Sequence, residues 1–217
     1  MSDETVDLIW EATLETLRMV GVAMAITIPL GLLVGVLLLL TARGAPLQQP
    51  IVNRLLGLIV NVGRSVPFII LLVALIPFTR AVVGTTIGTT AAIVPLTVAT
   101  IPFFARIVES SLREVPAGLV EAAQSAGASD RQVVTKVLVP EALPSLVAGA
   151  TITTIGVLGY SAMAGAVGGG GLGDVAIRYG YQRYETDVTI ATVVVLVVLV
   201  QLIQLVGDVL SRRLSHT

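Results

Sequence analysis

The stretch LREVPAGLVEAAQSAGASDRQVVTKVLVPEALP, residues 112–144, decides how this chain is organised, because it is a long polar passage between strongly apolar ones. Runs without any charged residue lie on either side of it, at residues 81–105 and 142–173. Such runs are long enough to cross the ~30 Å hydrocarbon core of a membrane as helices. The polar stretch must therefore contact something outside the bilayer.

Residue types within this stretch predict two short helices joined by a tight turn. Pro116 suits the first turn of a helix, where its missing N–H is not needed. Gly127 suits the position just past a helix end, where the backbone becomes left-handed. Ser129 and Gln132 have the spacing of a capping box for a second helix. Pro140 is expected to end that second helix.

Two helices joined by a turn also suggest a DNA-binding helix-turn-helix, but such a module needs a basic face. Here Arg131 and Lys136 are offset by Glu121, Asp130 and Glu141. We therefore expect no nucleic acid partner.

The overall composition is that of a membrane protein. Hydrophobic residues make up 55% of the 217 residues and charged residues 12%, with a mean hydropathy of +0.94. Soluble domains carry roughly a quarter charged residues.

The absence of cysteine excludes disulfides and thiolate metal sites, and a single histidine, His216, excludes a histidine cluster. An acidic N-terminus lacks the positive region of a cleaved signal peptide.

We predict an all-α polytopic protein with five transmembrane helices and a cytoplasmic loop at residues 112–140. The spans are expected at residues 19–42, 58–79, 81–105, in the first part of 142–173, and at 188–207. Gly31 and Gly35 form a small-xxx-small pair suited to close helix contact. The glycine-rich residues 165–173 are expected to be re-entrant or loop, because each Gly is about 1 kcal/mol less favourable than Ala in a helix. Residues 174–187 are expected to form a polar loop.

Charged residues indicate the orientation. Seven Lys and Arg residues fall on the side of the polar loop and four on the other, which follows the positive-inside rule. Residues 1–12 are then an extracytoplasmic N-terminal segment, 13–208 the transmembrane domain, and 209–217 a cytoplasmic tail.

Two sets of charges lie close to predicted spans. Asp3, Asp7, Glu11 and Glu15 are spaced four apart, as one acidic stripe that we interpret as a solvated helix face. Arg64 interrupts the second span, so its side chain should either reach the headgroups or pair with a carboxylate.

Missing motifs restrict the function. The glycines at 168–173 lack the Lys-Ser/Thr of a phosphate-binding loop. The single histidine, His216, lies on the C-terminal tail, so we expect no enzyme activity, cofactor or metal. The spans contain almost no carboxylates that could relay protons. Energy for transport would therefore come from a separate subunit docked on the polar loop, and an ATP-independent channel or a structural scaffold remain the alternatives.

The polar loop resembles the EAA loop shared by permeases of bacterial type I ABC importers, on the motif Glu121, Ala122, Ala123, Gly127, Val137 and Pro140. Val137 stands where the motif usually has Ile, and Val139 where it usually has Leu. The resemblance implies that these residues form a coupling helix that sits in a groove of the ATPase subunit.

Further stretches resemble the permease of methionine ABC importers over nearly the whole chain, at residues 64–71, 76–80, 83–88, 93–96, 159–165 and 171–173. This resemblance implies a type I ABC importer permease fold, transport of D- and L-methionine, and a homodimer. It also implies two ATP-binding-cassette ATPase subunits and an extracytoplasmic methionine-binding protein, soluble or lipid-anchored. A permease for another amino acid or a small sulfur compound remains the alternative.

Tyr160, Ser161 and Met163 lie where the fourth span meets the glycines, and we predict that they line the pathway. A thioether is flexible and polarizable, so Met163 could close a narrow apolar channel and move aside. The alternative is that Met163 packs against a neighbouring helix.

Overall fold

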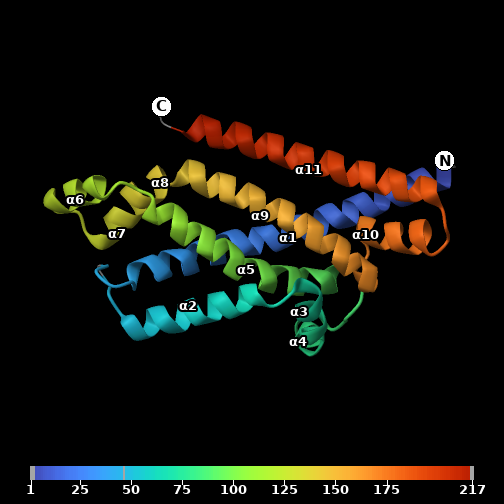
Figure 1. Ribbon diagram of the computed structural model, residues 1–217, viewed down its shortest axis with the longest axis horizontal. Helices are drawn as coiled ribbons and strands as arrows, with labels where there is room; N and C mark the ends of the chain where they lie inside the picture. Colours follow the sequence, from blue (N-terminus) through green and yellow to red (C-terminus); the bar gives the residue numbers. More distant parts are fainter. Residues whose placement is uncertain (1–2, 46, 216–217) are drawn as a thin grey trace.

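The computed structural model describes residues 3–45 and 47–215, and every regular element in these ranges is helical (Figure 1). The elements form an elongated bundle. In chain order they are α1 Asp3–Leu40, α2 Pro50–Ser65, α3 Phe68–Ala74, α4 Ile76–Val83, α5 Thr89–Arg113, α6 Ala117–Ser125, α7 Asp130–Val133, the π-helical turn η1 Val134–Leu138, α8 Val139–Glu141, α9 Leu143–Ala164, η2 Gly165–Gly169, α10 Gly171–Val175, η3 Ala176–Tyr181 and α11 Thr186–Leu214.

Within the described residues, four long segments are long and apolar enough to cross a membrane: α1, α5, α9 with η2, and α11. The pair α2 and α3 would form a fifth span, but it is bent by 105°. The all-α, multi-span architecture predicted from the sequence is therefore confirmed.

The second span, predicted over residues 58–79, is not one continuous helix. Val66 is extended (φ −85°, ψ 125°) between α2 and Pro67. A residue before proline is disfavoured in the helical region because the proline ring would clash with it, so the helix stops there. α3 and α4 then leave the line of α2 and lie to one side of the bundle (Figure 1).

α1 and α5 are in extensive contact along their lengths. A Cβ added to Gly31 would lie 2.7 Å from Phe104, and one added to Gly35 would lie 2.6 Å from Val108. The two glycines therefore let the backbones approach, as the small-xxx-small spacing predicted. Next to this contact, Met19 of α1, Leu96 of α5 and residues of α9 make a fully buried core.

One other predicted boundary needs correction. The third span begins at Thr89 rather than residue 81, because Gly84 (φ +77°) ends α4 and Gly88 (φ +93°) precedes α5. The first helix begins at Asp3 and runs without interruption past residue 12. Asp3–Leu40 is thus longer than the span predicted within it. His216 lies outside the described residues.

The glycine-rich segment is not a regular helix, as predicted: Val167 and Gly168 have non-helical backbone angles, and Gly168, Gly170 and Gly171 have positive φ. The polar loop predicted at 174–187 is wrong in its first part, since α10 and η3 keep residues 171–181 helical. The loop proper is short, at residues 182–185.

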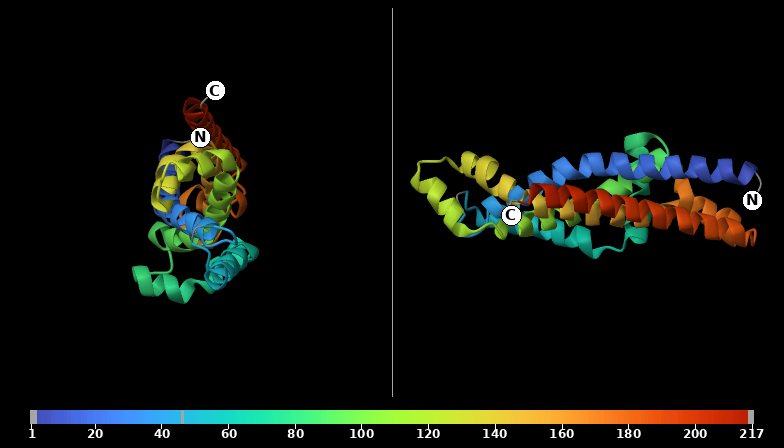
Figure 2. Two further views of the ribbon diagram at one scale, coloured as in Figure 1. Left: turned by 90° about the vertical axis from the view of Figure 1, so that its left-hand side faces the viewer. Right: turned by 90° about the horizontal axis from the view of Figure 1, so that it is seen from above.

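The bundle has two distinct ends (Figure 2). α6, α7 and α8 extend beyond the long helices at one end. The N-terminus and the turn between η3 and α11 lie at the other end. α11 ends on the side of the bundle where α6–α8 lie (Figure 1).

Candidate functional site: a coupling loop and a pathway segment

The coupling loop, residues 112–140, has the local geometry that its residue types predict. Pro116 (φ −56°, ψ 127°) directly precedes α6, and Gly127 after that helix has φ +83°. In the capping box of α7, the N–H of Gln132 donates to Oγ of Ser129 at 3.4 Å, and the N–H of Ser129 donates to Oε1 of Gln132 at 2.9 Å. A single αL residue and a reciprocal cap thus fix the turn between α6 and α7.

Pro140 does not end the second helix of the loop. It lies inside the turn Val139–Glu141, and α9 begins at Leu143. Proline is tolerated there because η1 has already displaced the backbone hydrogen bonds from the α pattern, and Pro140 occupies the first turn of a new short helix.

The predicted coupling residues divide into two groups. Glu121, Ala122, Gly127 and Pro140 are exposed, whereas Ala123 and Val137 are half-buried. Ala123 and Val120 pack on a cluster that contains Leu112, Val133 and Leu138. No residue of α6 is fully buried. One face of α6 therefore holds the loop to the bundle and the other, with Leu119 42% exposed, is free to contact another molecule.

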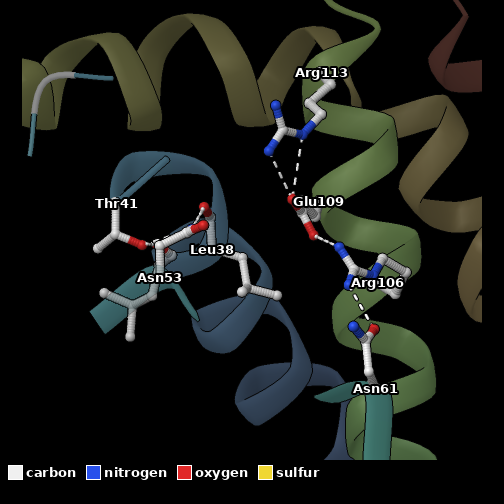
Figure 3. A network of polar contacts seen from close by, with 8 residues as sticks. Leu38, Thr41, Asn53, Asn61, Arg106, Glu109 and Arg113 are labelled. Atoms are coloured by element: carbon white, nitrogen blue, oxygen red, sulfur yellow. Dashed lines mark hydrogen bonds and ion pairs between the residues drawn. The ribbon is translucent and has the colours of Figure 1, made fainter. Parts of the chain in front are cut away.

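A buried carboxylate stands at the base of the coupling loop (Figure 3). Glu109 is 5% exposed; its Oε2 accepts from Arg106 at 2.5 Å and its Oε1 accepts from Arg113 at 2.7 Å. Arg106 also donates to Oδ1 of Asn61 on α2 at 2.7 Å. The network joins α2, through α5, to Arg113, the last residue of α5, where the coupling loop begins.

Sequence reasoning missed this network, although the spacing of three and four residues around Glu109 was a usable signal. A second polar contact nearby fixes the turn between α1 and α2. Nδ2 of Asn53 donates to the carbonyl of Leu38 at 2.8 Å and to Oγ1 of Thr41 at 3.0 Å (Figure 3).

Arg64 pairs with no carboxylate in residues 3–45 and 47–215. Its side chain is exposed at the end of α2, and the guanidinium lies 5.9 Å from the ring centroid of Phe103. The predicted carboxylate partner is therefore not found among these residues, and the reach to the headgroups stays a prediction. The cation–π contact was not expected.

The three predicted pathway residues do not share one environment. The ring of Tyr160 stacks on Phe68 of α3 with centroids 4.7 Å apart. Ser161 is 1% exposed and donates to the carbonyl of Leu158 at 2.7 Å. Met163 is 49% exposed. In this conformation Met163 is free of close packing, whereas Ser161 is enclosed by the chain itself.

The acidic stripe on α1 is not only a solvated face. Oε2 of Glu15 accepts the N–H of Gly171 at 2.7 Å, and Oγ1 of the buried Thr16 accepts the N–H of Leu172 at 2.9 Å. Both donors are in the first turn of α10, where backbone N–H groups lack helical partners. The interpretation of Glu15 as merely solvated was therefore wrong, whereas Asp3, Asp7 and Glu11 are exposed as predicted.

Long apolar helices and a capped polar loop with one unburied helix face define a polytopic membrane protein with an exposed polar loop at one end of its bundle. The pattern of the family described as the binding-protein-dependent transport system inner membrane component matches residues 27–216. The chain belongs to this family.

Relatives cover nearly the whole chain. A probable D-methionine transport system permease protein of Vibrio cholerae is 57% identical, over 97% of this chain and 93% of its own. The methionine import system permease protein of Bacillus subtilis is 43% identical, over 94% of this chain and 91% of its own. A chain in a structure of inward-facing conformations of the MetNI methionine ABC transporter is 50% identical, with a TM-score of 0.97 over 100% of both chains.

Proposed function

We propose that the chain is the permease subunit of an ATP-binding-cassette importer and forms the path by which methionine crosses the membrane. The observation that carries this proposal is the free face of α6 on a coupling loop of the EAA pattern, in a chain whose 43–57% identical relatives bear methionine-transport names. Methionine with either stereochemistry is the expected substrate. Another amino acid or a small sulfur compound is the alternative.

The proposed assembly is a homodimer with two ATPase subunits at the coupling-loop end and an extracytoplasmic methionine-binding protein at the other. The two separated ends of the bundle support this arrangement (Figure 2). An ATPase works in the cytoplasm, so the coupling loop and the end of α11 would be cytoplasmic. α1 crosses the membrane once from Asp3, which would then lie outside.

Coupling would act through Glu121, Ala122, Ala123, Gly127, Val137 and Pro140. The exposed members and the half-buried Val137 would contact the ATPase, and Ala123 would pass its motion to the bundle through the cluster around Leu112. Within this scheme the Arg106–Glu109–Arg113 network would keep α5 and α2 moving as one body.

Met163, with Tyr160 and Ser161 beside it, would line the pathway. Its exposed thioether supports a gating role, because a flexible unbranched side chain can close an apolar passage and rotate out of it. Ser161 would contribute only in a conformation that releases its bond to Leu158.

The test is uptake of labelled methionine into proteoliposomes that contain the chain, its ATPase and its binding protein. We expect uptake that requires ATP and all three components. Gly127→Val should abolish it, because a β-branched residue is strained at φ +83°. Gly118→Ala is the matched control: Gly118 is on α6 with nothing within 4 Å of an added Cβ. Uptake without the ATPase would instead indicate a channel, and uptake of another solute alone would reject methionine.

A further inference from the structure

An open apolar groove lies between α9 and α11 on the outside of the bundle. It has a volume of ≈ 600 Å³ and is lined by Val147, Thr151 and Thr154 of α9 and by Leu202, Val206 and Leu210 of α11, among others. Both threonines donate to carbonyls of their own helix, Thr151 to Val147 at 2.9 Å and Thr154 to Ala150 at 2.7 Å. The groove therefore presents hydrocarbon to whatever fills it.

The two helices that form the groove are held together at its coupling-loop end. Gly207 allows a very close approach, since an added Cβ would collide with the side chain of Thr151. Oγ of Ser211 donates to the carbonyl of Pro144 at 3.0 Å. Leu17 of α1 and Leu199 of α11 also line the groove. The groove is thus a fixed feature of the fold.

The length of the groove matches one leaflet. Its lining on α11 extends from Leu199 to Leu210, which at 1.5 Å per residue is about 17 Å. The hydrocarbon core of a bilayer is about 30 Å thick, so one leaflet is about 15 Å. α11 is also the least buried of the four long segments: 11% of its most apolar window is buried, against 33–50% for the other three.

A free cation continues the groove. Arg213 follows Leu210 by three residues and Val206 by seven, which places it on the same face of α11. Its side chain is exposed and has no hydrogen bond or ion pair with any residue that the structure describes. Its neighbour Arg212, in contrast, donates to the carbonyl of Asp208 at 3.2 Å.

We propose that this groove binds one anionic phospholipid of the leaflet on the coupling-loop side, with an acyl chain between α9 and α11 and the headgroup phosphate at Arg213. Such a lipid requires a groove that is lined by hydrocarbon, is as long as one leaflet and has an unpaired guanidinium at its end. The proposal rests on the membrane location of the chain and does not depend on which solute is transported.

The test is native mass spectrometry of the full chain purified with its ATPase, in detergent with phosphatidylglycerol or phosphatidylcholine of identical acyl chains. We expect one retained phosphatidylglycerol per copy of the chain. Arg213→Gln should lower the ratio of phosphatidylglycerol to phosphatidylcholine about fivefold, as expected for one basic residue beside an anionic headgroup. Arg212→Gln should leave the ratio unchanged.

A second variant fills the groove. Ala150 lines it, so Ala150→Phe should abolish retention of both lipids, whereas Ile152→Phe, on an exposed face outside the lining, should not. Equal retention in Ala150→Phe and the unmodified chain overturns the proposal. A changed subunit stoichiometry in Ala150→Phe without lipid loss also overturns it and makes the groove a contact between subunits. Methionine uptake measured on the same samples distinguishes this failure from failure of the transport function.

Discussion

The carboxylate of Glu15 accepts the backbone N–H of Gly171 at 2.7 Å, across 156 residues of sequence. Thr16 accepts the next N–H, that of Leu172, at 2.9 Å. The first helix of the chain therefore caps α10, directly after the glycines whose backbone angles break the preceding helix. Without these two acceptors the start of α10 would have unpaired N–H groups inside the protein.

Thr16→Val should accordingly destabilise the fold by about 1–3 kcal/mol, because it leaves the buried N–H of Leu172 without an acceptor while keeping the side-chain shape. Thermal unfolding in detergent, followed by the fluorescence of Trp10 or by circular dichroism, measures this. Glu11→Gln, one turn earlier on the exposed face of α1, is the control and should change little. Equal melting of Thr16→Val and the unmodified protein would show that the cap is dispensable.

This contact also marks the limit of what the sequence predicts. The capping box of Ser129 and Gln132 and the αL turn at Gly127 were predicted because each depends on residues within a few positions of one another. The Gly31–Gly35 pair was predicted because its spacing alone creates a flat helix face. The acceptor role of Glu15 depends on a backbone donor brought to it by the whole fold, so nothing near residue 15 indicates it.

The errors at the second and third spans have a different origin. Pro67 was visible in an apolar run, but hydropathy alone does not distinguish a straight helix from one that bends by 105° at the residue before a proline. Likewise, the charge-free run from residue 81 contains Gly84 and Gly88, and their positive φ separates α4 from α5. In both places backbone conformation, rather than polarity, sets the helix boundary.

Glu109→Gln should weaken coupling between ATP hydrolysis and uptake. The amide keeps the shape of the carboxylate but leaves Arg106 and Arg113 as two uncompensated cations at one end of α5, at a cost of about 1–3 kcal/mol after allowance for their exposure. The measurement is the ratio of methionine imported to ATP hydrolysed in proteoliposomes. The matched control is Glu114→Gln, since Glu114 is exposed and its side chain forms no ion pair with any residue that the structure describes. An unchanged ratio would restrict the network to a structural role.

Ser129→Ala should release the N-terminus of α7, because it removes the acceptor for the N–H of Gln132; loss of such a cap typically amounts to ~1 kcal/mol. Hydrogen exchange of the amides at residues 130–133 should become about fivefold faster. Ser125→Ala, at the exposed end of α6, serves as the comparison. If both variants exchange alike, the capping box does not hold the coupling loop in shape.

Gly35→Val should separate α1 from α5. The new Cβ would lie only 2.6 Å from the Cβ of Val108, and overpacking of this kind costs about 1–3 kcal/mol. The melting temperature in detergent should fall clearly. Gly21→Ala on the same helix meets nothing within 4 Å and should raise it slightly through helix propensity. A melting temperature of Gly35→Val equal to that of the unmodified chain would contradict the close α1–α5 contact.

Met163→Ala tests the proposed gate. If the exposed thioether narrows the pathway, its removal should increase the passive leak of methionine from loaded vesicles in the absence of ATP, and should raise basal ATP hydrolysis. Ile152→Ala removes a similarly exposed side chain of α9 three turns away and should do neither. The leak must be compared at equal protein content, because a pore acts in proportion to its number. If leak and hydrolysis stay at the level of the unmodified chain, Met163 packs against a neighbouring subunit or lipid and is not the gate. The residues that close the pathway would then be sought around Tyr160 and Phe68, whose stacked rings have centroids 4.7 Å apart.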